Sequence, residues 1–396
     1  MIAAGAATAR RPLVLLGAGI VAALNIGKLP PALAALQAEF GLSLVQVSWM
    51  VSLFMVGSAL FGIGGGSLAD RFDPRRVMIG GLALMALASA VGAATHSTVV
   101  LFASRALESL AFLLVVLPAP AMLRQSVPDS SLRGWLGAWG AYMPTGMAAG
   151  LFFTPMLMAI AGWRGVWAFS AAAAAVLAVL VAVTLPPRAA HGTAPASIAA
   201  QAMATVRAPG PWLIAACFAF YAGQFTGIFS FLPTVYREYG ISPQLGGSLT
   251  ALAVLCNAAG NLAGGQFAQR GVDRAALIAS VGVTMGVCAW VAFGSTLGFP
   301  WRYAALMVLS AVGGVIPSTL FATAPFYAPS AAAVSSTVGL MMQGAGVGQI
   351  VVPVTLAALA QYTGSWDSTW MATGLAALAT VAIAAMMRRY DATRRG

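Results

Sequence analysis

The sequence predicts an all-α membrane protein with about twelve transmembrane helices. Of its 396 residues, 60% are hydrophobic and only 7% are charged, which is more apolar surface than a fold in water needs. The apolar residues form runs of helical length, and about 20 such residues cross the hydrocarbon core of a bilayer. Short charged connections separate these runs, as in residues 66–76. A membrane β-barrel is excluded, because its strands are about ten residues long and alternate in polarity.

The predicted spans follow the apolar runs in chain order. They occupy residues 12–36, 44–66, 77–95, 98–123, 134–161, 165–185, 211–236, 247–268, 274–293, 300–325, 331–360 and 366–387. The segment 186–210 is the one long polar interruption, and its Pro, Gly, Ala and Ser residues are typical of a flexible tether. We therefore expect two six-helix bundles, over 1–185 and 211–396. A cytosolic linker over 186–210, with a short surface helix over 197–206, joins them.

The arginines of the loops lie almost entirely on one side of the membrane. With twelve spans and both termini on the same side, only Arg164, Arg237 and Arg302 fall on the opposite side. Cytoplasmic loops carry an excess of Lys and Arg, so the net charge of +11 is a topology signal and does not indicate a nucleic-acid partner. The distribution predicts a multi-pass protein of a bacterial-type inner membrane with both termini in the cytoplasm.

The connection between the second and third spans carries a recognisable motif. Its sequence, Gly66-Ser67-Leu68-Ala69-Asp70-Arg71-Phe72-Asp73-Pro74-Arg75-Arg76, resembles the loop 2–3 signature of the major facilitator superfamily of secondary transporters, with Asp73 in place of the usual Gly. The resemblance implies the superfamily fold of two pseudo-symmetric six-helix bundles. It also implies a conformational latch whose charges pair with neighbouring helix ends, formed by Gly66, Asp70, Arg71, Arg75 and Arg76. The alternative role of these arginines is to determine topology.

The motif recurs in the second half of the chain. Residues 265–274 (GQFAQRGVDR) follow the eighth span and repeat the order Gly, three residues, a polar residue, Arg, three residues, Arg. Such repetition, together with the resemblance, indicates two parallel halves with a substrate site between them near the bilayer midplane. Leu101-x-x-x-Arg105 is similar to the start of the superfamily's second signature, and residues 162–167 are similar to its turn into the sixth span.

Three charged residues lie inside predicted spans. Lys28, the only lysine, lies about 24 Å into the first span, and Arg105 and Glu108 lie about 10 and 15 Å into the fourth, which runs in the opposite direction. All three therefore occupy the outer half of the bilayer. The resemblance to the superfamily places them on facing walls of a central cavity. A charge within a span is costly unless it meets water, a partner or substrate.

Two cations against one carboxylate predict a cavity of net positive charge and an anionic substrate. We expect Lys28 and Arg105 to bind the anion and Glu108 to carry a coupling proton, because a protonated Glu108 favours the anion further. Two alternatives stay open. Lys28 can extend to the outer headgroups, and Arg105 and Glu108, three residues apart on one helix, can simply neutralise one another.

Neutral polar side chains inside spans are the remaining candidates for substrate binding, where they would orient the ligand. They are Asn25, Tyr221, Gln224, Asn257, Asn261 and Gln343. Asn25 lies three residues before Lys28 on the same helix face. Hydrogen bonding between helices is the alternative role for each of these residues, since buried amides hold membrane helices together.

The leading prediction is a proton-coupled symporter of a small organic or inorganic anion. Asn25 ahead of a cation in the first span resembles the cyanate-transporter branch of the superfamily, in which Arg follows Asn, whereas Ile26-Gly27-Lys28 follows here. The alternative is a proton-driven exporter of drugs or metabolites, which suits a roomy cavity with many Phe and Met residues. The superfamily's antiporter signature is poorly met, because Met143 precedes Pro144 and Met147-Ala148 replace its paired glycines.

No sequence pattern indicates an enzyme, a cofactor or a metal site. The chain has no nucleophile–histidine pair and no phosphate loop, and His96 and His191 fall in loops. Cys217, Cys256 and Cys288 lie in predicted spans, where they serve as small apolar packing residues. We expect a monomer in a lipid bilayer whose partners are protons and a small-molecule substrate.

Overall fold

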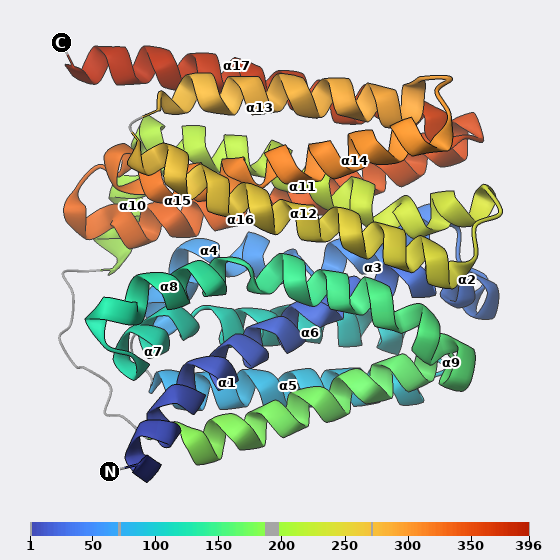
Figure 1. Ribbon diagram of the computed structural model, residues 1–396, viewed down its shortest axis with the longest axis horizontal. Helices are drawn as coiled ribbons and strands as arrows, with labels where there is room; N and C mark the ends of the chain where they lie inside the picture. The colour runs from blue at the N-terminus through green and yellow to red at the C-terminus, as the bar shows by residue number, and fades with distance from the viewer. Residues whose placement is uncertain (1, 70–72, 187–197, 271, 396) are drawn as a thin grey trace.

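The computed structural model describes residues 2–69, 73–186, 198–270 and 272–395, and these residues form helices and turns without any strand. Figure 1 shows the helices of the first half below those of the second half, with both termini at the same end of the molecule. The first half contains α1 (Ile2–Gly27), α2 (Leu29–Phe40), α3 (Leu44–Leu53), α4 (Val56–Ala69), α5 (Pro74–Ala94), α6 (Thr98–Val116), α7 (Ala119–Ser126), α8 (Asp129–Gly140) and α9 (Tyr142–Thr184).

The second half begins after a short helix in the predicted linker, α10 (Ile198–Arg207), which lies where the sequence predicts a surface helix. It contains α11 (Pro209–Glu238), α12 (Pro243–Gln269), α13 (Arg274–Ala289), the π-helix η1 (Trp290–Gly294), α14 (Phe299–Gly313), α15 (Val315–Tyr327), the 3-10 turn η2 (Ala331–Ala333), α16 (Val334–Thr363), the 3-10 turn η3 (Trp366–Ser368) and α17 (Thr369–Arg395). The boundaries of the two bundles and the linker stay predictions.

Eleven helical stretches of the described residues are long and apolar enough to cross a membrane. One of them is α9, whose 43 residues would extend about 64 Å as a straight helix, twice the hydrocarbon thickness. Gly162 interrupts α9 with φ 63° and ψ −176°, a conformation that suits glycine, and the chain reverses direction within α9 (Figure 1). Its two limbs are the predicted fifth and sixth spans, so the prediction of about twelve spans is confirmed.

The first span is broken at its charged residue. α1 ends at Gly27 and α2 begins at Leu29, followed by Pro30 and Pro31. Since proline has no amide hydrogen, these two positions donate no helical hydrogen bond to the preceding turn. Lys28 keeps helical angles, φ −68° and ψ −28°, so α1 and α2 continue as one span with Lys28 at their junction.

Both halves begin their third span in the same way. Asp73 caps α5 with φ −57° and ψ 114°, and its carboxylate accepts a hydrogen bond from Arg75 N at 3.1 Å. Asp273 caps α13 with φ −58° and ψ 114°, and accepts from Ala276 N at 2.8 Å. The predicted repeat is therefore present, but it is shifted by one residue. The capping residues Asp73 and Asp273 occupy equivalent positions in the two halves, whereas the sequence repeat aligns Arg75 with Arg274. The second loop contains one more residue than the first.

In each half, a hydrogen bond between a carboxylate and an indole joins equivalent helix ends. Trp163 Nε1 donates to Glu39 Oε2 at 2.7 Å and so joins α2 to the second limb of α9. Trp366 Nε1 donates to Glu238 Oε1 at 3.0 Å and joins α11 to η3, which precedes α17. The first span is thus fastened to the sixth as the seventh is to the twelfth, which is the pseudo-symmetry expected of two repeated bundles.

Apolar packing joins the two halves at the end of the molecule away from the termini. There α2 packs against α11, and side chains of both halves belong to one buried cluster. Figure 1 shows α2 and α3 at this end. We call six residues of this cluster, drawn from both halves, the apolar seal: Leu29, Leu33, Met50, Trp167, Phe231 and Val235.

The halves also meet where α4 crosses α16. A Cβ atom added to Gly339 would lie 2.6 Å from the Gly62 carbonyl oxygen, and one added to Gly62 would lie 2.5 Å from the Gly339 carbonyl oxygen. Both distances are too short for a carbon–oxygen contact, so the two backbones approach this closely only because both residues are glycines. The crossing joins the second span to the eleventh.

We expect Gly339→Ala to lower the melting temperature, because the added methyl group forces α4 and α16 apart at a cost of about 1–3 kcal/mol in the free energy of unfolding. The matched control is Gly80→Ala on the exposed side of α5, where an added Cβ meets no atom within 4 Å. Differential scanning fluorimetry of the detergent-purified variants measures both. Equal melting temperatures would show that the crossing tolerates a wider spacing.

Candidate functional site

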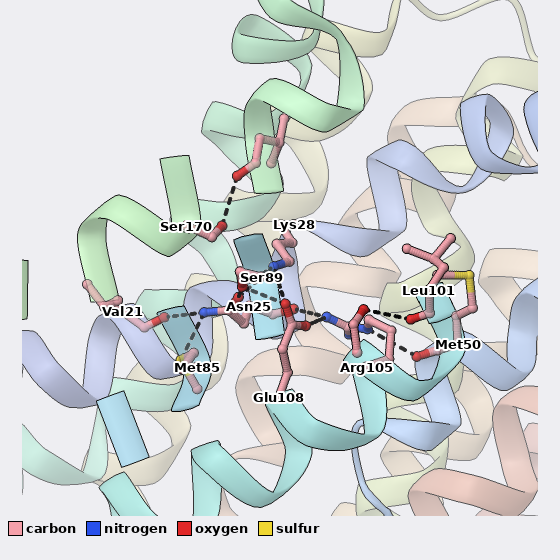
Figure 2. A network of polar contacts seen from close by, with 12 residues as sticks. Val21, Asn25, Lys28, Met50, Met85, Ser89, Leu101, Arg105, Glu108 and Ser170 are labelled. Atoms are coloured by element: carbon pink, nitrogen blue, oxygen red, sulfur yellow. Dashed lines mark hydrogen bonds and ion pairs between the residues drawn. The ribbon is translucent and has the colours of Figure 1, made fainter. Parts of the chain in front are cut away.

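The three charged residues of the predicted spans meet in one cluster. Lys28 Nζ lies 2.7 Å from Glu108 Oε1, and Arg105 Nη1 pairs with Oε2 of the same carboxylate (Figure 2). The side chains of Lys28 and Glu108 are 0% exposed and that of Arg105 is 1% exposed. The two cations therefore share one carboxylate in a region that solvent does not reach.

Lys28 uses all three of its ammonium protons. They are donated to Asn25 Oδ1 at 2.6 Å, to Ser89 Oγ at 3.1 Å and to Glu108 Oε1 at 2.7 Å. The ammonium nitrogen also lies 4.6 Å from the centre of the Trp167 ring, within the range of a cation–π interaction. A lysine ammonium has three donors and no acceptor, so the hydrogen-bonding capacity of Lys28 is filled.

The Glu108 carboxylate is equally well bound. Its Oε1 accepts from Lys28 and from the Ser89 hydroxyl, the latter at 2.6 Å, while Oε2 accepts from Arg105. Arg105 Nη1 also donates to the Asn25 carbonyl at 3.1 Å, and the Arg105 guanidinium lies 4.8 Å from the centre of the Phe54 ring. These contacts compensate for the loss of water around the buried charges.

The helices α1, α2, α5 and α6 position the hydrogen-bonded residues of the cluster. Lys28 lies at the junction of α1 and α2, and Asn25 lies one turn earlier on α1. Arg105 and Glu108 lie one turn apart on the same face of α6, and Ser89 comes from the buried face of α5. The formal charge of the cluster is one positive unit, because two cations face one carboxylate. An excess charge in a region of low dielectric constant interacts strongly with any anion that enters.

The structure decides between the alternatives that the sequence leaves open. Lys28 does not extend to the headgroups, because its side chain is fully buried against Glu108. Arg105 and Glu108 do pair on one helix face, as the second alternative predicts. This pair is nevertheless not self-contained, since the same carboxylate binds Lys28.

The sequence prediction omits two members of the cluster, Ser89 and Trp167. Ser89 lies among alanines and glycines in the third predicted span. Serines in spans commonly hydrogen-bond their own helix backbone, so a serine at this position does not indicate a binding site. Trp167 lies at the end of the segment 162–167, which predicts a turn into the sixth span and does not indicate contact with a charge. Only the packing of α5 against α6, and of α9 against α1 and α2, brings them to the charges.

The polar residues of the second half form a separate group. Asn257 Nδ2 donates to the Tyr221 hydroxyl at 2.9 Å and to the Ser310 carbonyl at 3.0 Å, and Asn261 Nδ2 donates to Asn257 Oδ1 at 2.9 Å. These bonds join α11, α12 and α14. Asn257 thus has the interhelical role that the sequence leaves as the alternative.

The two predicted glutamines differ from this group in having unpaired amide atoms. Gln224 on α11 is 1% exposed, and its Nε2 has no hydrogen-bond partner among the described residues. Gln343 on α16 is half-buried, and its Oε1 likewise lacks a partner in the described part of the chain. A further glutamine, Gln349, donates to Thr226 Oγ1 at 2.9 Å and joins α16 to α11. A buried donor without a partner costs about 1–3 kcal/mol, so the predicted substrate role of Gln224 would satisfy its amide but stays a prediction.

The structure describes part of the predicted latch. Two of its residues lie outside the described residues: Asp70 and Arg71. Gly66 lies in the last turns of α4, Arg75 Nη2 donates to the Ala182 carbonyl of α9 at 2.5 Å, and the Arg76 side chain is 81% exposed. Arg75 therefore contacts a helix end within its own half, and the latch role stays a prediction.

A cavity of about 490 Å³ lies away from all of these groups. It is a partly open pocket bordered by the end of α11, η1 and the starts of α12 and α14, with Tyr236, Leu249, Phe293, Phe299 and Leu306 in its wall. None of the predicted site residues lines it. Because it lies within the second half, it is not a space between the two bundles.

The fold and the site define a class of protein: two repeated six-helix bundles with charges buried inside spans are typical of secondary transporters. A sequence model of the Major Facilitator Superfamily matches residues 15–347, and the chain belongs to this family. It is accordingly a multi-pass membrane transporter, and at the level of the family it is not an enzyme.

Solved structures of the family share this fold. A bacterial homologue of the human lysosomal transporter Spinster, in an inward-facing and occupied conformation, matches with a TM-score of 0.76 and 15% identity over 96% of this chain and 97% of that one. The transporter FucP in its outward conformation matches with a TM-score of 0.67 and 15% identity over 96% and 99% of the two chains. At these identities the likeness establishes the fold alone.

Relatives of the chain include an anion transporter and antibiotic-resistance proteins. The probable nitrate/nitrite transporter NarK2 of Mycobacterium tuberculosis is 28% identical over 328 residues, which is 81% of each chain. The methylenomycin A resistance protein of Bacillus subtilis is 29% identical over 157 residues, or 39% of this chain and 34% of that protein. The tetracenomycin C resistance and export protein of Streptomyces glaucescens is 29% identical over 133 residues, 25% of its length. The matches to the two resistance proteins thus span about a third and a quarter of those proteins.

We expect Glu108→Gln to be far more destabilising than Lys28→Met. The first change leaves two buried cations without a counter-charge and costs about 3–5 kcal/mol in the free energy of unfolding. The second leaves a neutral Arg105–Glu108 pair. Glu39→Gln is the control for an exposed ion pair, worth about 1 kcal/mol or less. Thermal unfolding in detergent measures all three, and equal losses for Glu108→Gln and Lys28→Met would contradict this account of the cluster's charge.

Proposed function

We propose that the protein is a secondary active transporter that moves a small organic or inorganic anion together with protons by alternating access. The observation that carries the proposal is the buried cluster in which Lys28 and Arg105 share the single carboxylate of Glu108. Its excess positive charge attracts an anion, and the low dielectric constant of the surroundings strengthens that attraction.

The similarity to a nitrate/nitrite transporter supports an anionic substrate. That relative matches along 81% of both chains, across both predicted bundles. The resistance proteins match over a smaller part of their length. The comparison therefore favours a small inorganic or organic anion over a large neutral drug.

The remaining predicted residues complete the proposed site. Asn25 holds Lys28, and Gln224 offers its free amide donor to the substrate, with Gln343 as a further polar contact from α16. Tyr221, Asn257 and Asn261 form the polar wall of the second half. We further propose that the protein works as a monomer in an inner membrane with both termini in the cytoplasm.

Proton coupling follows from the position of Glu108. Protonation of its carboxylate removes the negative charge of the cluster, so that Lys28 and Arg105 are free to bind a substrate anion. Proton binding and anion binding then favour each other by the same coupling free energy. We propose that the anion gains access when the apolar seal opens, because the seal includes Trp167, which contacts Lys28.

We expect small anions to raise the melting temperature of the detergent-purified protein, because a ligand that binds the native state stabilises it by mass action. Nitrate, nitrite, cyanate, formate and acetate are the probes. Lys28→Ala and Arg105→Ala are each expected to weaken the binding by about tenfold or more, since each removes a charge-assisted contact. Unchanged anion affinity in both variants would exclude this site.

We expect anion binding to strengthen as the pH falls, because protonation of Glu108 raises the charge of the cluster. The charged groups that face Glu108 are Lys28 from the α1–α2 junction and Arg105 on α6, and α5 contributes the neutral Ser89. The helices α3 and α4, which also pack against α6, contain no titratable side chain.

Isothermal titration at several pH values measures this dependence, with Glu108→Gln as the variant that mimics the protonated state. It is expected to bind the anion at every pH with little change in affinity. A variant that keeps the pH dependence of the wild type would show that another group carries the proton.

The second candidate function is export of drugs or metabolites. An aromatic row on α11 favours it: the rings of Phe218 and Tyr221 are stacked with 6.1 Å between their centres, and those of Phe225 and Phe229 are tilted by 46° with 4.7 Å between their centres. Such surfaces bind flat apolar molecules. Stabilisation by bulky lipophilic cations or neutral drugs, and by none of the small anions, would favour the exporter and remove substrate binding from Lys28.

A further inference from the structure

We propose that the carboxylate of Glu108 occupies the binding position of the substrate, as a tethered anion that the transported anion replaces. The substrate is then a small planar oxyanion that bridges Lys28 and Arg105 in the same way. This inference rests on the proposed function, because it takes the substrate to be an anion, but it adds where the anion binds and what shape it has.

The contacts around the carboxylate are those of an anion-binding site. Each oxygen meets one cation, with Lys28 Nζ 2.7 Å from Oε1 and Arg105 Nη1 on Oε2. The Ser89 hydroxyl supplies a third donor, 2.6 Å from Oε1. Three donors from three different elements thus converge on one carboxylate, which is how proteins bind free carboxylates and related oxyanions.

The filled hydrogen bonds of the cluster exclude a substrate that merely adds to it. All three protons of Lys28 already have acceptors, and Lys28, Arg105 and Glu108 are 0–1% exposed. An anion therefore reaches Lys28 only if it takes the place of an existing acceptor. Glu108 is the acceptor that can leave, because a proton on its carboxylate removes its charge and its attraction to both cations.

The geometry selects the substrate's shape. A planar oxyanion such as formate or nitrate presents two oxygens side by side, as the Glu108 carboxylate does, and can bond both cations at once. A halide has a single centre and no such pair of oxygens. Each cation is also packed against an aromatic ring, Lys28 against Trp167 and Arg105 against Phe54. An anion that replaces the carboxylate between these packed cations is therefore expected to have little bulk.

Truncation of the tethered anion tests this proposal. Glu108→Ala removes the carboxylate and leaves a gap between Lys28, Arg105 and Ser89. Added formate or nitrate is expected to fill it and to raise the melting temperature by about 3 °C at a hundredfold excess over Kd. Chloride at the same ionic strength is expected to give less than a third of that rise.

Glu39→Ala is the matched control. Glu39 is also a carboxylate held by a cation and an indole, with Arg164 Nη1 at 2.6 Å and Trp163 Nε1 at 2.7 Å, but it lies at an exposed helix end. Formate is expected to leave the melting temperature of that variant unchanged relative to chloride. An equal response of both truncated variants would mean a general anion effect and would overturn the proposal.

If Glu108→Ala folds poorly, parallel purification in formate and in chloride tests whether an added anion restores folding. Recovery of monodisperse protein in formate alone supports the proposal, and failure in both anions contradicts it, since formate restores the missing contacts. The proposed function is tested separately, by anion binding to the wild type. Wild-type binding without rescue would leave the anion-transport function intact and place the substrate elsewhere. Rescue without wild-type binding would overturn the anion-transport function, and the inference with it.

Discussion

The organisation of the first half depends on one carboxylate that two cations share out of reach of water. Charge buried in a region of low dielectric constant is unfavourable unless it is paired and fully hydrogen-bonded. Glu108 therefore fixes the positions of Lys28 and Arg105, and the filled donors of Lys28 in turn fix Asn25 and Ser89. The α1–α2 junction, α5 and α6 are held together by this single network (Figure 2).

The apolar seal connects this network to the opposite half. Leu29 follows Lys28 directly, and Trp167 contributes both to the seal and to the cation–π contact with Lys28. Separation of α2 from α11 would therefore disturb the surroundings of the charges as well as expose them. Under the proposed alternating-access function, Trp167 would link the charged cluster to the contact between the two halves. The carboxylate–indole pairs of Glu39 and Glu238 meanwhile hold the helix ends away from the termini within their own halves.

Prediction from the sequence was accurate where the bilayer imposes a simple rule on span length. Apolar runs of about 20 residues located the spans, because only helices of that length cross the hydrocarbon core. It was less accurate where backbone geometry decides: the repeat around Asp73 and Asp273 is shifted by one residue, since the caps and not the arginines align. The fifth and sixth spans form one continuous element because Gly162 turns the chain without a loop.

By itself, the sequence determined the class of fold, the number of spans and the presence of Lys28, Arg105 and Glu108 within them, because hydropathy and charge placement are local properties of the chain. The tertiary structure decided that these three residues touch, that Ser89 and Trp167 join them and that Lys28 does not extend to the headgroups. The physical reason is that hydrogen bonds and ion pairs act over a few ångströms. Lys28 and Glu108 are 80 positions apart in the chain and Lys28 and Trp167 are 139 apart, and only helix packing brings them within that range.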